Sequence, residues 1–264
     1  VGSGLGVLAL AIGLVVLLYW LLQSVAGRDV LLAQIVARLP AGSSLTWEKA
    51  EGPIAGPLVF HGLEFRYQDY RFTARRALLD PDIRPLLGRR LRLDALEIEG
   101  ATLELAASDE PFELPRWPES LPAIEMPIPI QADRIAIDGL AVSSGGEHAI
   151  DIRTLRGGID IANGSLRAER IDIDSDRGLF SLHGSYEPAH DYRTDLLATA
   201  VLPAPHGHSP ARLGLLARGD LSKMEVGIGG RAPEPLRATL TLGGDKDAPN
   251  WRLAATSEGL DPAL

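Results

Sequence analysis

The first 27 residues form one apolar block. Residues 5–22 are apolar or glycine without interruption, and no charged side chain occurs before Arg28. As a helix this run extends about 27 Å, close to the roughly 30 Å of a bilayer core. A cleaved signal peptide is the alternative, because Ser24-Val25-Ala26 has small residues where a signal peptidase requires them. We predict an uncleaved transmembrane signal-anchor over residues 1–27, with membrane positions Leu5, Leu10, Leu14, Leu17, Leu18, Tyr19 and Trp20.

The next segment has the period of an amphipathic helix. Between Asp29 and Leu39, the apolar residues Leu31, Leu32, Ile35, Val36 and Leu39 form one stripe, while Arg28, Gln34 and Arg38 are polar. Pro40 ends the pattern. We predict a short amphipathic helix over residues 28–40, which either lies at the membrane surface or packs against the domain that follows.

From Leu45 onward the apolar period changes to two. Large apolar residues recur at every second position, as in Leu91/Leu93 and Ile135/Ile137, which is typical of strands with one buried face, and Gly, Pro, Asn and Asp separate such runs. We therefore predict an antiparallel β-sheet. The candidate residues of its apolar face are Leu91, Leu93, Leu96, Ile98, Leu103, Leu105, Ile135, Ile137, Leu140, Val142, Ile159, Ile161, Ile171 and Ile173.

An eight-residue pattern of apolar, any, apolar, polar, small, apolar, any, apolar recurs. It fits residues 58–65, 91–98 and 135–142, with Gly62, Asp94-Ala95 and Gly139 near its small position. The small residue predicts a bulge at which the apolar face changes register. Loose repeats of one sheet unit favour an elongated stack of strands.

Prolines divide the β region. The segment 109–130 contains six prolines, which cannot join a central ladder, so it is predicted to be an extended connector. The β segments are then 41–108 and 131–264, and we expect the second to be truncated at its C-terminal end.

Charge distribution narrows the classes of function. Residues 101–264 hold 15 basic and 25 acidic side chains, a net charge of −10, and residues 1–100 carry a net +1, which together give the −9 of the chain. This acidic surface disfavours nucleic-acid binding. The chain contains no cysteine, which excludes disulfides, thiolate nucleophiles and cysteine-ligated zinc.

Candidate metal sites are weak. The run Asp172-Ile-Asp174-Ser-Asp176 resembles the start of an EF-hand loop, but Arg177 and His183 stand where Gly and Glu are needed. His206 and His208, considered with His183 or His190, lie among prolines and are expected to be surface residues. No motif of a hydrolase, zinc protease or P-loop is present. We expect no metal, no cofactor and no catalytic residue.

The order of the pieces resembles the N-terminal region of the TamB family, within the wider AsmA-like group of Gram-negative envelope proteins. The resemblance rests on the apolar leader followed by Leu45-Thr-Trp47, Glu51-Gly-Pro-Ile-Ala-Gly-Pro-Leu58 and Phe60-His-Gly-Leu63. It continues through Arg84-Pro-Leu-Leu-Gly88 and the proline-rich connector. Leu79-Asp80-Pro81 departs from the family pattern, in which an apolar strand usually runs into Trp or Ser-Pro.

The resemblance implies a mainly β protein: a membrane helix and a short amphipathic helix, then an elongated, curved antiparallel sheet forming an open hydrophobic groove. It implies anchoring in the inner membrane with the bulk of the chain in the periplasm. The groove would conduct phospholipid acyl chains towards the outer membrane. The outer-membrane barrel TamA would be a partner through a C-terminal region absent from this chain, and the family is linked to autotransporter assembly.

Two alternatives remain open from the sequence. An apolar sheet face is also what a closed sandwich or barrel requires for its core. A second function is a structural or chaperone module that pairs with outer-membrane protein strands by β-augmentation.

Overall fold

A computed structural model describes residues 24–82, 90–106, 129–204, 207–232, 234–244 and 250–257. Of these residues, 71% lie in strands, so the prediction of a mainly β protein is confirmed. The elements are α2 (Val25–Ala37), β1 (Ser43–Thr46), β2 (Lys49–Glu51), β3 (Leu58–Tyr67), β4 (Tyr70–Asp82), β5 (Leu91–Leu105), β6 (Ile130–Ser144), β7 (Glu147–Ala162), β8 (Ser165–Ser175), β9 (Gly178–Glu187), β10 (Arg193–Val201), β11 (Arg212–Gly219), β12 (Lys223–Arg231), β13 (Pro235–Gly243) and β14 (Asn250–Ser257).

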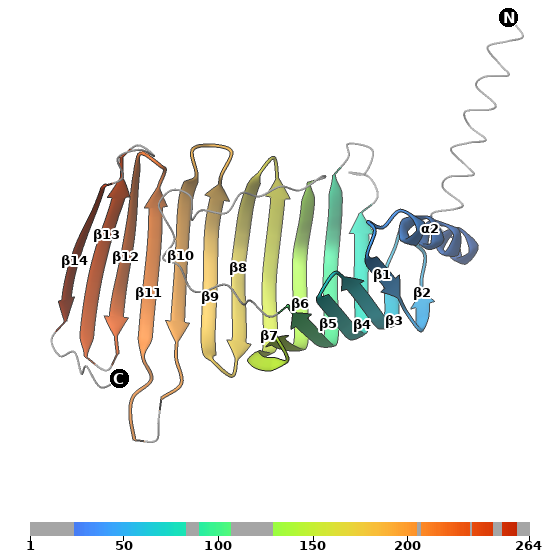
Figure 1. Ribbon diagram of the computed structural model, residues 1–264, viewed down its shortest axis with the longest axis horizontal. Coiled ribbons are helices and arrows are strands. Elements are labelled where there is room, and N and C mark those ends of the chain that lie inside the picture. The colour runs from blue at the N-terminus through green and yellow to red at the C-terminus, as the bar shows by residue number, and fades with distance from the viewer. Residues whose placement is uncertain are drawn as a thin grey trace, which may run out of the picture.

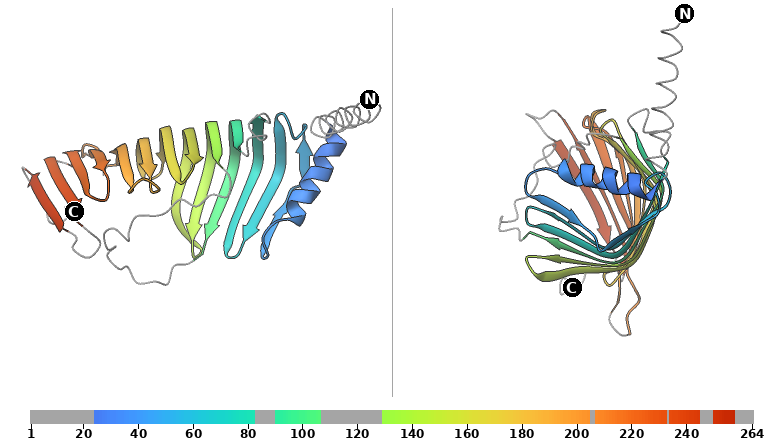
Figure 2. Two further views of the ribbon diagram at one scale, coloured as in Figure 1. Left: turned by 90° about the horizontal axis from the view of Figure 1, so that it is seen from above. Right: turned by 90° about the vertical axis from the view of Figure 1, so that its right-hand side faces the viewer.

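All fourteen strands belong to one sheet (Figure 1). Apart from β2, which pairs beside β1 on the outer edge of β3, each strand pairs with its neighbours along the chain up to β14. The sheet is open, and within the described residues no second sheet packs on it. The closed sandwich or barrel is therefore not the architecture of this part of the chain. Seen down the long axis of the sheet in Figure 2, the strands bend into a curve, and α2 lies across the opening of that curve at one end.

The prediction of a wholly antiparallel sheet is wrong for one pair of strands. β5 and β6 run parallel, with Leu91 opposite Ile130 and Leu103 opposite Val142. A parallel pair needs a connection that returns along the length of the strand, whereas antiparallel neighbours are joined by tight turns. The segment between Leu105 and Ile130 is long enough to supply that return.

The predicted bends are present, but the second repeat begins at another residue. Gly62, Gly100 and Gly139 have left-handed φ angles of +59°, +59° and +77° and lie at one level of the sheet. The register sets Leu58, Leu96 and Ile135 in one row, so the middle repeat starts at Leu96 and not at Leu91. A left-handed residue resets the strand alternation, which is why Leu63 packs with Leu58 and Phe60.

The predicted bend at Asp94-Ala95 exists as a separate bulge. The register between β4 and β5 shifts at Asp80 and Pro81, which leaves Asp94 without an opposite residue. Pro81 has no backbone N–H to donate to the ladder, which accounts for an interruption at this place.

The helix α2 lies close to its predicted position, but it presents a different face to the sheet. Leu32 is buried against Leu58, Phe60 and Ala77, whereas Ile35 and Val36 from the predicted apolar stripe are exposed. Arg28, expected on the polar face, is only 7% exposed. Its Nη1 donates to the carbonyl oxygens of Ala50 (2.7 Å) and Gly52 (3.2 Å), and these bonds offset the cost of its burial.

No helix of the described residues is long and apolar enough to span a membrane. The predicted membrane positions Leu5, Leu10, Leu14, Leu17, Leu18, Tyr19 and Trp20 lie outside the described residues. The greater part of the predicted connector 109–130 also lies outside them.

Candidate functional site

One face of the sheet is apolar from end to end. Strand partners in register have their side chains on the same face, so one register row can be followed across the sheet. We call the row through Ile137 the Ile137 row. Its only polar member is Ser257, on the last described strand. It consists of Ala50, Phe60, Ala77, Ile98, Ile137, Leu155, Ile173, Phe180, Ala200, Leu213, Gly230, Leu236 and Ser257.

The candidate residues predicted for the apolar face lie on this face together. Leu93 and Ile159 share a row through Ala132, and Ile171 lies opposite Leu182. Leu103 pairs with Val142 on the other side of the glycine bend. The sequence pattern therefore predicts which face each of these side chains takes, and the register brings them together.

Several residues of the apolar face were not predicted. Small buried alanines lie between the larger side chains, among them Ala77, Ala101 and Ala132 at 2–4% exposure. Phe180 and Leu182 on β9 also belong to this face. Their alternation with Ser181 and His183 is the signal that would have identified them.

The apolar face is only partly covered by protein. Leu93 and Ile135 are buried at 7% exposure and form a small cluster with Ala132. The other predicted residues, including Ile137 and Leu140, are half-buried. Since neighbouring rows shield one another from the side, half-burial is what a sheet face without a covering layer gives.

The opposite face carries the charges. Residues next to the Ile137 row alternate to this side and form ion pairs across strands. Arg76 contacts Glu99 at 2.7 Å, and Arg156 Nη2 contacts Asp138 Oδ1 at 2.6 Å. Arg92 donates to Asp133, and this hydrogen bond is the main reason that the pKa of the Asp133 carboxyl is lowered. The two faces of one sheet thus have opposite chemistry.

A hollow of about 930 Å³ lies on the charged face over β8 to β11. Arg167, Arg170 and Arg218 line it together with Leu197 and Leu216. Arg218 Nη2 is 3.1 Å from Asp195 Oδ1, so one of the three arginine cations that line the hollow is already paired with a carboxylate. This hollow is separated from the apolar face by the sheet itself.

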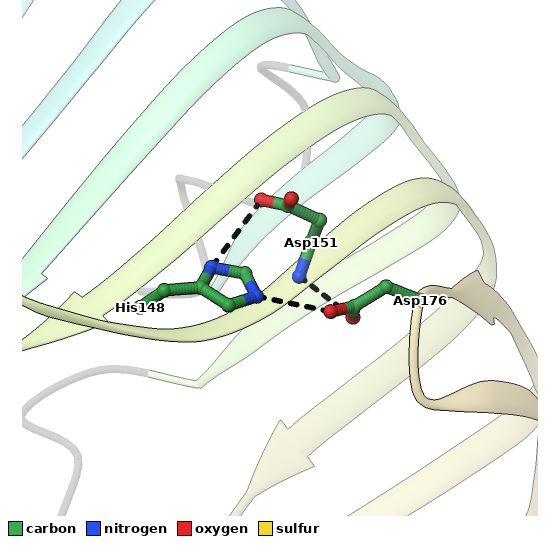
Figure 3. Close-up of side chains that lie close together, drawn as sticks. All are labelled: His148, Asp151 and Asp176. Carbon is green, nitrogen blue, oxygen red and sulfur yellow. Dashed lines mark hydrogen bonds and ion pairs between the residues drawn. The ribbon is translucent and has the colours of Figure 1, made fainter.

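Three side chains near one end of β7 could hold a metal ion by their positions alone (Figure 3). His148 Nε2 lies 3.0 Å from Asp176 Oδ2, and its Nδ1 lies 3.9 Å from Asp151 Oδ1. The backbone N–H of Asp151 donates to Asp176 Oδ1 at 2.9 Å. All three side chains are exposed and interact with one another, which explains their grouping without an ion. Asp176 is also the last aspartate of the run that resembles an EF-hand, while Asp174 pairs with Arg153.

The Asp176 carboxyl is expected to titrate below the ordinary value for aspartate. Its pKa is lowered first by the hydrogen bond with His148 and then by the bond from the Asp151 backbone. The stabilisation is therefore present above the ordinary aspartate pKa and is lost as the pH falls through the lower folded value. Carboxyl-carbon NMR measures the Asp176 pKa in the wild type and in His148→Ala. The pKa should be higher in the variant, because the hydrogen bond from His148 is lost. An identical titration in both proteins would contradict the assigned contact.

Comparison with protein families gives one finding. Residues 14–177 match the family described as TamB, N-terminal domain. The match includes β1 to β8 and therefore the first half of the apolar face. Searches of curated proteins and of solved structures gave no match.

Proposed function

The chain belongs to the family of TamB N-terminal domains, and from this premise we propose that its apolar face is a groove for phospholipid acyl chains. The protein would conduct phospholipids towards the outer membrane and take part in outer-membrane assembly. The observation that carries the proposal is the Ile137 row, apolar across the sheet and half-exposed at its centre. We propose a non-enzymatic role, since no polar groups converge on the part of the apolar face that the described strands form.

The chemistry of the face suits this cargo. Exposing a sixteen-carbon acyl chain to water costs on the order of 13 kcal/mol, at about 0.8 kcal/mol for each methylene. A surface of Leu, Ile and Val side chains removes much of that cost without binding one lipid tightly. Convergent polar groups would instead fix one ligand in place. Aliphatic residues and few aromatics therefore favour movement along the face over storage.

The proposed setting follows the family and the N-terminal sequence. TamB proteins are membrane-associated, and the uncharged run of residues 5–22 has the length of an inner-membrane anchor. The sheet would then extend into the periplasm. We propose TamA as the outer-membrane partner, contacted by a region outside residues 1–264.

A second candidate function has one observation in its favour. β14 forms an edge of the described sheet, with Trp251 71% and Leu253 57% exposed. An open edge can pair with a strand of another protein. The alternative is therefore a chaperone for outer-membrane proteins that acts by β-augmentation and moves no lipid.

Site-specific photo-crosslinking in cells separates the two functions. Crosslinkers at Leu91, Ile137 and Ile161 are expected to capture phospholipid, because these half-buried positions lie on the apolar face. A crosslinker at Ala141, exposed on the charged face of β6, is the matched control and should capture none. Capture of protein alone at the three apolar positions would exclude lipid conduction and favour the chaperone.

A further inference from the structure

The helix α2 has an unusual distribution of side chains. Its buried side contains Gly27, Arg28 and Leu32. Its exposed side contains Val25, Ala26, Val30, Ala33, Ile35, Val36 and Ala37, with only Asp29 and Gln34 as polar members. Val25 and Val30 are 57% and 56% exposed. A helix at a protein–water boundary normally has the reverse arrangement, with its charges outward.

The polar groups in the first turn of α2 are bonded within the protein. Arg28 donates to the carbonyls of Ala50 and Gly52 and to Asp29 Oδ1 at 2.8 Å. The Ser24 hydroxyl accepts from the Gly27 N–H and caps the first turn. The helix is therefore fixed to the end of the sheet by its buried side, and its outward apolar surface has no covering side chain among the described residues.

Position and length identify the surroundings of this outward face. The apolar run 5–22 ends two residues before Ser24, so an anchor there would hold α2 beside the bilayer. Thirteen residues extend about 20 Å, too short for the roughly 30 Å of a bilayer core, so the helix can lie in a membrane but not cross it. Residues 28–92 carry 11 basic and 7 acidic side chains, which complements anionic headgroups.

We infer that the outward face of α2 lies in the headgroup interface of a phospholipid bilayer, while Leu32 closes the end of the apolar face. One helix then contacts the membrane on one side and the first strands of the sheet on the other. The inference extends the proposed anchoring, but it does not require that the sheet carries lipid.

The absence of cysteine allows a direct test with the full chain. Single-cysteine variants Val30→Cys and Ala33→Cys place a fluorescent label on the outward face of α2, and Thr239→Cys on the charged face of β13 is the control. The labelled proteins are reconstituted into vesicles of phosphatidylcholine and phosphatidylglycerol. Lipids brominated near the headgroup should quench the α2 labels about twofold or more, as expected for an interfacial helix. The Thr239 label should not respond.

Three results would overturn the inference. Quenching of the α2 labels by aqueous iodide would show that the outward face is in water. Protection from both quenchers would show that protein covers it, either residues 1–22 or a second copy of the chain. Stronger quenching by lipids brominated deep in the acyl chain would place α2 in the bilayer core. None of these results depends on crosslinking at Ile137, so failure here and failure of lipid conduction are distinguishable.

Discussion

Replacing Ile137 and Leu140 together with aspartate is expected to stop lipid movement along the sheet while the protein remains folded. Both side chains are half-buried at the centre of β6 on the apolar face. A carboxylate on this surface keeps its water, and displacing that water for a passing acyl chain costs several kcal/mol. Because about 1.4 kcal/mol corresponds to a tenfold change, we expect lipid capture beyond β6 to fall about tenfold or more.

Two photo-crosslinking positions measure this result. Leu91 lies on β5 before the substitutions and Phe180 lies on β9 after them, and both are half-buried. If lipid enters from the α2 end, capture at Phe180 falls and capture at Leu91 persists. The reverse would indicate flow from the other end, and unchanged capture at both would contradict conduction along this face.

The matched control places the same charges on the other face of the same strand. Ala136 and Ala141 alternate with Ile137 and Leu140 and lie on the charged side of β6. Ala136→Asp with Ala141→Asp should leave capture at Phe180 unchanged. Circular dichroism of both double variants reports folding. Loss of the sheet only in the Ile137 and Leu140 variant would mean that the face is a closed core.

Phe60→Ala is expected to give the largest loss of stability. Phe60 is 6% exposed, packs with Leu32 of α2 and makes an edge-on contact with Trp47 at 5.4 Å between ring centroids. Removing a buried phenylalanine side chain costs about 3–5 kcal/mol. Because the cluster joins α2 to β3 and β4, the loss should appear there first, as faster proteolysis around residues 24–40 and a lower urea midpoint.

Phe65→Ala is the control for this prediction. Phe65 lies on the same strand and the same face, but it is half-buried and outside the Phe60 cluster. Its loss should cost roughly 1 kcal/mol, because less apolar surface returns to water. Equal destabilisation by the two variants would show that the apolar face is packed uniformly and that α2 adds no local core.

The period of two was sufficient to predict most of the sheet and the face on which the large candidate residues lie, although Phe180 and Leu182 were missed. Each of Ile137, Ile159 and Ile173 is followed by an aspartate, and the alternation of side chains fixes the face of each residue whichever strand it pairs with. No comparable pattern in the sequence predicts the burial of Arg28. It depends on the carbonyls of Ala50 and Gly52, which pairing of β2 with β3 brings beside α2.

The direction of β6 relative to β5 could not be predicted from the sequence either. Side chains alternate in the same way in parallel and antiparallel strands, so alternation does not distinguish the two kinds of pairing. Only the path of the connection decides, and six prolines in residues 109–130 indicate an extended segment without giving its course. The small members of the face, such as Ala101 and Ala132, were missed because alanine carries little hydrophobic signal.

The parallel pairing of β5 with β6 has a consequence for how the chain folds. Most other neighbouring strands close through short turns, such as Asn163-Gly164 between β7 and β8, and such hairpins form from local contacts. Joining Ile130 to Leu91 requires a much longer loop to close. The entropy of that closure is lost before any contact between the two strands stabilises the pair. Hairpin growth can therefore proceed separately from β1 to β5 and from β6 to β14. Pairing of Leu91–Leu105 with Ile130–Ser144 is then the slow step in folding, because it joins two independently nucleated halves into one continuous sheet.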